Sequence, residues 1–132
     1  ERLRSGGARY ALPGRPPRFG MLRHVFVAPT DDQATAAARH AFADHFASFA
    51  HLWRRHGSER FAEPLDFDQL VAERRMFVGS PATVAGQVTE AVTAGEVNYL
   101  ACAFAWGSLD VDDVLRSLAL FRDEVIPAVR HS

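Results

Sequence analysis

The order of apolar and polar positions divides this chain into short apolar runs and longer segments of helical period. The apolar run at Met21–Ala28 predicts a strand that is buried on both faces. Thr30 follows as the N-cap of a helix over about Asp31–His56, which Gly57 ends. Within this helix an apolar stripe at spacings of four, three and four residues predicts core packing: Phe42, Phe46, Phe49 and Trp53.

The second half of the chain repeats the alternation. A helix over about Asp66–Arg75 leads into a short apolar strand end at Met76–Val78. After Gly79, Ser80 is expected to cap a helix that ends at Gly95. Because a polar cap follows each apolar run directly, the connections from strand to helix are predicted to be short.

An apolar strand over Val97–Ala105 precedes the last helix, which Asp110 caps and Pro127 ends or kinks. Strands that alternate with helices predict a parallel sheet. Residues 1–20 are rich in Arg, Gly and Pro and are expected to form a loop or linker. The expected inner face of the last helix is Val111, Val114, Leu115, Leu118, Phe121, Val125 and Val129.

Composition excludes several classes of function. The formal net charge of −1 gives no reason to expect a nucleic-acid or acidic-membrane partner. No apolar run approaches the roughly 18 residues of a membrane span. The single cysteine, Cys102, lies in an apolar strand, where we expect a buried structural thiol. A disulfide framework is therefore not predicted, and the expected location is the reducing cytoplasm.

Histidine is frequent but does not have the spacing of a metal site. Four histidines lie on the first predicted helix at spacings of five, six and five residues: His40, His45, His51 and His56. Two ligands on one helix face need a spacing of four. We therefore predict no metal site and expect these histidines at the surface or in helix packing. No nucleophile motif stands near Ser80, Ser108 or Ser117, so the catalytic residues are left unassigned.

Two short motifs are candidates for ligand binding. In "VGSP", Gly79 and Ser80 begin a helix directly after a strand, where free N–H groups can hold a phosphate. Plain N-capping is the alternative for the same residues. Trp106 and Gly107 follow the last strand, at the edge where parallel βα sheets build their active sites. These four residues are the predicted cofactor-binding residues.

Three segments in this order resemble the C-terminal part of the bacterial luciferase-like monooxygenase family: "LRHVFVAPTDDQATAAAR", "MFVGSPATVAGQV" and "NYLACAFAWGSLDVDDVLRSLALFRDEVIPAVR". The resemblance covers about Leu22–Arg130. It implies an α/β fold in which residues 21–132 form the C-terminal portion of a TIM (βα)8 barrel, about three parallel strands with flanking helices. His24 does not match the position of the family's catalytic histidine, which the resemblance places upstream with the main phosphate contacts.

The resemblance also implies a function. Members oxidise small organic molecules with reduced FMN and O2, and a related branch uses a deazaflavin coenzyme. We expect this chain to contribute to such an enzyme and to be inactive alone. The alternatives are a non-catalytic half-barrel interaction module and a deazaflavin-dependent oxidoreductase. An open three-stranded sheet has unpaired edges, so we also expect a homo-oligomer joined through strand edges or the last helix.

Overall fold

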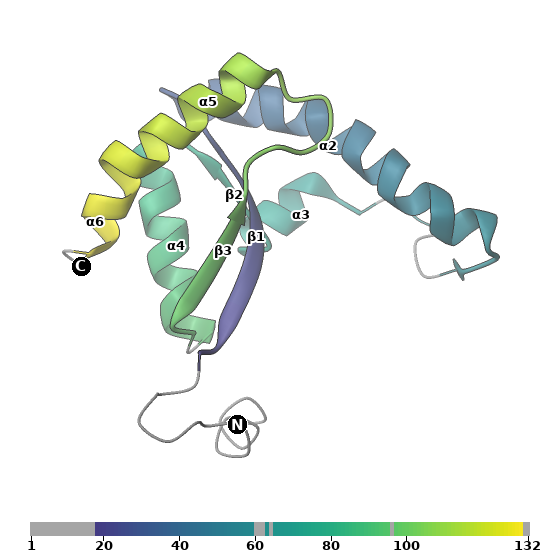
Figure 1. Cartoon of the computed structure of the whole chain (residues 1–132), viewed down its shortest axis with the longest axis horizontal. Helices are drawn as coiled ribbons and strands as arrows, with labels where there is room; N and C mark the ends of the chain where they lie inside the picture. The colour runs from purple at the N-terminus through teal and green to yellow at the C-terminus, as the bar shows by residue number, and fades with distance from the viewer. Residues whose placement is uncertain (1–17, 60–62, 64, 96, 131–132) are drawn as a thin grey trace.

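The computed structural model describes residues 18–59, 63, 65–95 and 97–130 (Figure 1). Residues 1–17 of the predicted linker lie outside these ranges, and the predicted linker boundary falls at the start of the first strand. In chain order the elements are strand β1 (Gly20–Val27), helix α2 (Asp31–Arg55), helix α3 (Phe67–Ala72), strand β2 (Met76–Gly79), helix α4 (Pro81–Gly95), strand β3 (Tyr99–Ala103), helix α5 (Val111–Leu120), a π-helical turn (Phe121–Val125) and helix α6 (Ile126–Arg130).

The three strands form one parallel sheet in the order β2-β1-β3, which confirms the predicted α/β class with flanking helices. The central strand β1 divides its length between its neighbours. Its first part, Gly20–His24, pairs with β3, and its last part, His24–Val27, pairs with β2. Because β3 returns to the far side of β1, the ends of β2 and β3 are separated by the central strand (Figure 1).

Helices cover both faces of this sheet, and each face has its own core. On one face Phe26, Met76 and Val78 pack against α2 and α3. On the other, Val25, Val27 and Phe77 pack against α4 and the end of the last helix. Alternate residues of β1 therefore enter different cores, which explains why its sequence is a continuous apolar run.

The structure corrects the predicted packing of α2. Phe42 and Phe46 are buried as predicted, but Phe49 is 48% exposed and Trp53 is 38% exposed. Helix α2 is longer than the sheet that it covers, and its distal half projects past the strands (Figure 1). The apolar stripe of α2 continues at helical spacing into this distal half, where no sheet is present to bury it.

The predicted inner face of the last helix is correct in its second part, where Val125 is fully buried and Phe121 and Val129 pack against the same core, and wrong in its first part. Val111, Leu115 and Leu118 were expected inside, yet all three are exposed. Ser117, which is fully buried, faces the sheet instead, because its hydroxyl binds the backbone of β1. Pro127 does not end the helix. The wider π-helical turn directly before it relieves the clash of a proline ring with the preceding turn.

Strand β3 is shorter and more exposed than predicted. It covers Tyr99–Ala103 rather than Val97–Ala105, and Tyr99 is exposed at its start. The thiol of Cys102 is only partly buried, and this burial raises its pKa to about 11. Such a thiol stays protonated at neutral pH, although it is less buried than predicted. Among the described residues, no helix is both long and apolar enough to cross a membrane.

A side chain bonds the backbone of β2 at its outer edge. The amide of Gln87 accepts a hydrogen bond from the N–H of Val78 and donates one to the carbonyl of the same residue, both at 3.0 Å. Gln87 is buried and thus reproduces the pairing of a neighbouring strand. At Val78 the outer edge of β2 is therefore already hydrogen-bonded within the chain.

Candidate functional site

The turn between β2 and α4 binds an anion that belongs to the protein itself. The backbone N–H of Ser80 donates to Oδ1 of Asp31 at 2.6 Å, and the hydroxyl of Thr83 donates to Oδ2 at 3.0 Å. Hydrogen bonds from Ser80 and Thr83 favour the charged carboxylate, so they lower the pKa of Asp31. Asp31 therefore joins the first turn of α2 to the first turn of α4.

Gly79 makes room for this arrangement. Its φ of 153° is a conformation that L side chains rarely adopt. A Cβ added there would also lie 2.7 Å from Cγ2 of Thr83 and 2.8 Å from Oδ1 of Asp31. Glycine at this position thus allows the Asp31 carboxylate to reach the N-terminus of α4.

Two side chains complete the edge of β1 beyond the end of β3. The indole Nε1–H of Trp106 donates to the carbonyl of Val25 at 3.3 Å. The N–H of Val27 donates to Oγ of the buried Ser117 at 2.8 Å. These bonds replace the strand pairing that β3 provides to the first part of β1. Trp106 and Ser117 therefore satisfy backbone groups of β1 that would otherwise be buried without partners.

Trp106 also packs against two histidines that are far apart in the sequence. The ring centroids of His24 and His45 are 4.7 Å apart, and those of His24 and Trp106 are 5.7 Å apart, both pairs edge to face. Partial burial disfavours the charged imidazoles and lowers the pKa of both histidines, and for His24 the neighbouring His45 adds to this effect. Both imidazoles are therefore neutral near pH 7. A hollow of about 200 Å³ beside them is bordered by Arg75.

Gly107, a predicted cofactor-binding residue, lies in a tightly packed turn. Its φ of 60° lies in the left-handed region, and a Cβ added to it would overlap the carbonyl oxygen of Ala41 on α2. The turn after β3 is thus pressed directly against the backbone of α2. Trp106 beside it is only 6% exposed, so both residues of this turn have close contacts within the protein.

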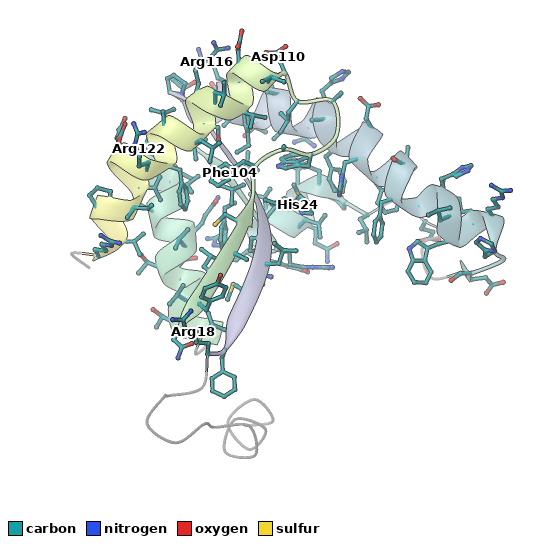
Figure 2. All side chains as sticks on the ribbon, in the orientation of Figure 1. Arg18, His24, Phe104, Asp110, Arg116 and Arg122 are labelled. Atoms are coloured by element: carbon teal, nitrogen blue, oxygen red, sulfur yellow. The ribbon has the colours of Figure 1, made fainter. Side chains whose placement is uncertain are left out.

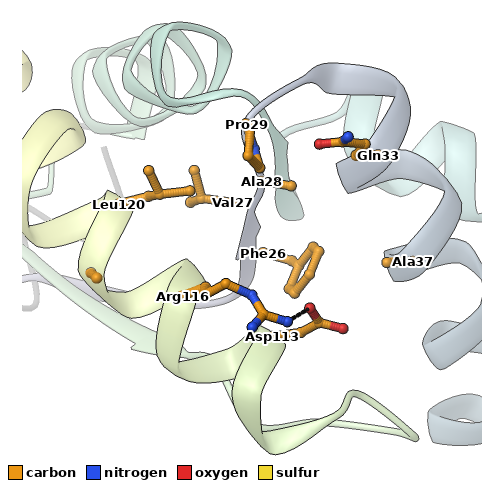
Figure 3. A pocket seen from close by; sticks show the side chains of 10 residues that line it. Phe26, Val27, Ala28, Pro29, Gln33, Ala37, Asp113, Arg116 and Leu120 are labelled. Carbon is orange, nitrogen blue, oxygen red and sulfur yellow. Dashed lines mark hydrogen bonds and ion pairs between the residues drawn. The ribbon is translucent and has the colours of Figure 1, made fainter.

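A larger hollow of about 570 Å³ lies at the carboxyl end of β1, between α2 and α5 (Figure 3). Phe26, Val27 and Leu120 contribute apolar side chains to its wall. Asp113 and Arg116 line it from α5 and form an ion pair of 2.6 Å. Its volume is in the range of small-molecule sites.

The four predicted binding residues therefore lie in two separate places. Gly79 and Ser80 are at the end of β2, whereas Trp106 and Gly107 follow β3 on the other side of the central strand. The pairing of His24 with His45 and the role of Ser117 were missed, because these contacts join residues that are distant in sequence. In the described part of the chain, no group of three or more His, Cys, Asp or Glu side chains could hold a metal ion.

Known proteins of similar structure support the fold described above. No family model matches the chain. The uncharacterized protein y4wF of Sinorhizobium fredii is 27% identical over 112 residues, which are 84% of this chain and 33% of that protein.

Solved structures that are similar to the chain include the following three. Monooxygenase RslO1 from Streptomyces bottropensis has a TM-score of 0.68 and 18% identity, over 99% of this chain and 36% of its own. The oxygenating constituent of 3,6-diketocamphane monooxygenase from Pseudomonas putida, a type II Baeyer–Villiger monooxygenase in complex with FMN, has a TM-score of 0.60 and 24% identity, over 83% and 33%. Apo-MsnO8 has a TM-score of 0.55 and 24% identity, over 98% of this chain and 40% of its own. The chain shares the fold of a part of these proteins and spans about a third of the length of the first two and of y4wF.

Proposed function

We propose that this chain is part of a flavin-dependent monooxygenase that oxidises a small organic substrate with reduced FMN and O2. The observation that carries the proposal is its likeness to the FMN complex of a type II Baeyer–Villiger monooxygenase over 83% of the chain. The activity is proposed for a whole protein, because the chain corresponds to only 33% of that structure. The FMN in that structure favours FMN over a deazaflavin.

The first turn of α4 fits an anionic group such as the FMN phosphate. The carboxylate of Asp31 already accepts hydrogen bonds from Ser80 and Thr83 there, so this position stabilises negative charge. A phosphate would use the same donors and would have to displace Asp31. Gly79 and Ser80 are accordingly proposed as phosphate contacts, and the carboxylate of Asp31 occupies this position when no phosphate is bound.

Trp106 and Gly107 are proposed to shape the wall of the cofactor site from the turn after β3. Because Trp106 is buried and bonded to Val25, its proposed contribution is to position this turn. Bound FMN supplies the redox chemistry with O2. The residues of this chain would bind and orient the cofactor and exclude water from it.

Titration with oxidised and reduced FMN, followed by flavin fluorescence, tests this proposal. The unmodified chain should bind weakly, because Asp31 competes with the phosphate. Asp31→Ala removes the competitor and should raise the affinity about ten- to hundredfold, since a hydrogen bond to a charged group contributes about 1.5–3 kcal/mol. Asp32→Ala is the matched control in the same helical turn and should leave the affinity unchanged.

The outcomes of this titration are distinct. Saturable binding at micromolar FMN by the Asp31→Ala chain would support the proposed contacts at Gly79 and Ser80. An absence of binding by both chains up to millimolar FMN, in either redox state, would overturn them.

A second candidate is a non-catalytic interaction module, which the apolar side chains exposed on α5 favour. Val111 is 70% exposed, Leu115 58% and Leu118 40%, and their spacing places them on one helix face. A second copy of the chain could bury this face, as the expectation of a homo-oligomer requires. Light scattering should then show a dimer that Leu115→Arg converts to a monomer. A monomer at all concentrations would remove this candidate.

A further inference from the structure

The hollow between α2 and α5 is apolar over most of its wall. The end of β1 contributes Phe26 and Val27, helix α2 contributes Ala37, and helix α5 contributes Ala119 and Leu120. A wall of this kind accommodates an apolar molecular body, and the few polar side chains that share it determine which class of ligand fits.

Those polar side chains carry no net charge. Among the described residues that line the hollow, two are charged, and they pair with each other: Nη2 of Arg116 donates to Oδ1 of Asp113 at 2.6 Å. Gln33, which is uncharged, lines the hollow from α2 on the side opposite this pair (Figure 3). Because each charge has its opposite beside it, the attraction and the repulsion that they exert on a bound ion nearly cancel.

The ion pair can still form hydrogen bonds with a ligand. A guanidinium group has further N–H donors, and a carboxylate has a second oxygen that can accept. A hydroxyl group could therefore donate to Asp113 and accept from Arg116. An ionic head group would lose part of its hydration at this apolar wall, and a pair without net charge does not compensate for that loss.

The hollow also lies beside the proposed phosphate contacts. Ala28 lines it, and the N–H of Ala28 donates to the carbonyl oxygen of Gly79 at 3.2 Å. Asp31, which accepts from the N–H of Ser80, follows Ala28 by three residues. A molecule in the hollow would thus lie next to a group bound at Ser80.

We infer that the hollow between β1, α2 and α5 binds an uncharged, mostly apolar organic molecule, and that the pair of Asp113 and Arg116 selects against both anions and cations. As a statement about the substrate, this inference rests on the proposed function, because it limits the substrate of that enzyme to uncharged molecules. The binding itself needs no flavin and is tested without it.

The selectivity that the pair provides is modest, because the side chain of Asp113 is 43% exposed and that of Arg116 is 68% exposed. A charge of this exposure changes binding by up to about fivefold, which corresponds to about 1 kcal/mol. We therefore expect the apolar wall to provide most of the affinity and the ion pair to set the order among ligands with the same apolar body.

The test compares three probes with one rigid apolar body by isothermal titration calorimetry: adamantan-1-ol, 1-adamantylammonium and adamantane-1-carboxylate. A rigid body loses little conformational freedom on binding, so the differences between the probes report on the head group. The unmodified chain should bind the alcohol most tightly and both ions about two- to fivefold more weakly.

Variants that remove one charge test the role of the pair. Arg116→Gln leaves Asp113 without its partner and should strengthen binding of the ammonium probe about two- to fivefold while weakening that of the carboxylate. Asp113→Asn should have the reverse effect. Arg122→Gln is the matched control: Arg122 pairs with Asp123 further along the helical segment and does not line the hollow, so the order of the probes should not change (Figure 2).

A second pair of variants locates the binding. Ala37→Leu adds bulk to the wall and should weaken all three probes. Ala36→Leu adds the same bulk to the neighbouring residue, which is exposed and does not line the hollow, and should leave the three affinities unchanged.

Three results would overturn the inference. The first is no binding of any probe up to millimolar concentration, and the second is tighter binding of either ion than of the alcohol by the unmodified chain. The third is binding of the alcohol that Ala37→Leu does not weaken, with circular dichroism showing that the variant is folded. Binding of the alcohol by a chain that fails to bind FMN would remove the proposed function and leave the hollow as a site for uncharged molecules, so the two proposals fail separately.

Discussion

The turn after β2 and the turn after β3 have the same position in a βα unit but differ in what they contact. Ser80 presents its N–H to a carboxylate that a ligand could replace. Trp106 instead bonds the backbone of the central strand, and Gly107 touches the backbone of α2. Exchangeable contacts suit binding, whereas contacts to buried backbone suit stability. The same kind of sequence motif, a glycine after an apolar strand, therefore makes two different kinds of contact.

The largest effect is expected at Gly107. Gly107→Ala forces a Cβ into the carbonyl oxygen of Ala41 at a φ that favours glycine, so the turn or α2 must shift. We expect a loss of about 3–5 kcal/mol in the free energy of unfolding, measured by urea denaturation. Gly86→Ala is the control: a Cβ there meets nothing within 4 Å, and the helix should gain about 0.5–1 kcal/mol. Equal stability of the two variants would contradict the close approach.

Trp106→Phe should have the next largest effect. The variant keeps an aromatic ring but removes the N–H that bonds the carbonyl of Val25. A buried carbonyl left without its partner costs about 1–3 kcal/mol. Thermal unfolding monitored by circular dichroism would measure this loss. A variant as stable as the parent chain would show that the indole bond contributes nothing.

Gly79→Ala should destabilise by about 1–3 kcal/mol through backbone strain, and it should also displace Asp31. Once Asp31 loses its hydrogen bonds to Ser80 and Thr83, its pKa should rise toward the ordinary aspartate value. NMR titration of the carboxyl carbon gives this pKa. If the pKa of Asp31 stays low in the variant, Gly79 is not what allows the contact.

The smallest effect is expected from pH. The pKa values of His24 and His45 are lowered in the folded state, so protons bind the unfolded chain preferentially. Stability should be complete above the ordinary histidine value of about 6.5 and fall as the pH drops below it. Unfolding midpoints between pH 7.5 and 5.5 test this, and His24→Gln should flatten the profile. A stability that rises toward pH 5.5 would contradict the sign.

Much of the fold could be predicted because local chemistry determines it. Thr30 and Asp110 cap their helices as expected, and the apolar runs at Val25–Val27 and Met76–Val78 are buried strand segments. Burial in the last helix was predicted correctly for Val125 but wrongly for the first part of the helix, where the bond between Ser117 and Val27 turns Ser117 toward the sheet. This contact joins residues that are 90 positions apart, and helical periodicity contains no information about it.

The candidate site was predictable only in its location. Parallel strands place their carboxyl ends at one edge, so the turns at Ser80 and Gly107 were both expected there. The strand order β2-β1-β3, which separates these turns, depends on which strand β3 pairs with. The role of Asp31 could not be predicted either, because its position suits the dipole of α2 as well as it suits the N-terminus of α4.

The most direct test of the difference between the two turns is a ¹H–¹⁵N NMR titration of the chain with FMN. It would follow the backbone amide of Ser80 and the indole N–H of Trp106. If the contact at Ser80 is exchangeable and the contact at Trp106 is structural, the Ser80 signal should move as FMN displaces Asp31, and the indole signal should move much less. An indole signal that shifts while Ser80 stays fixed, or two signals unchanged up to millimolar FMN, would contradict this account.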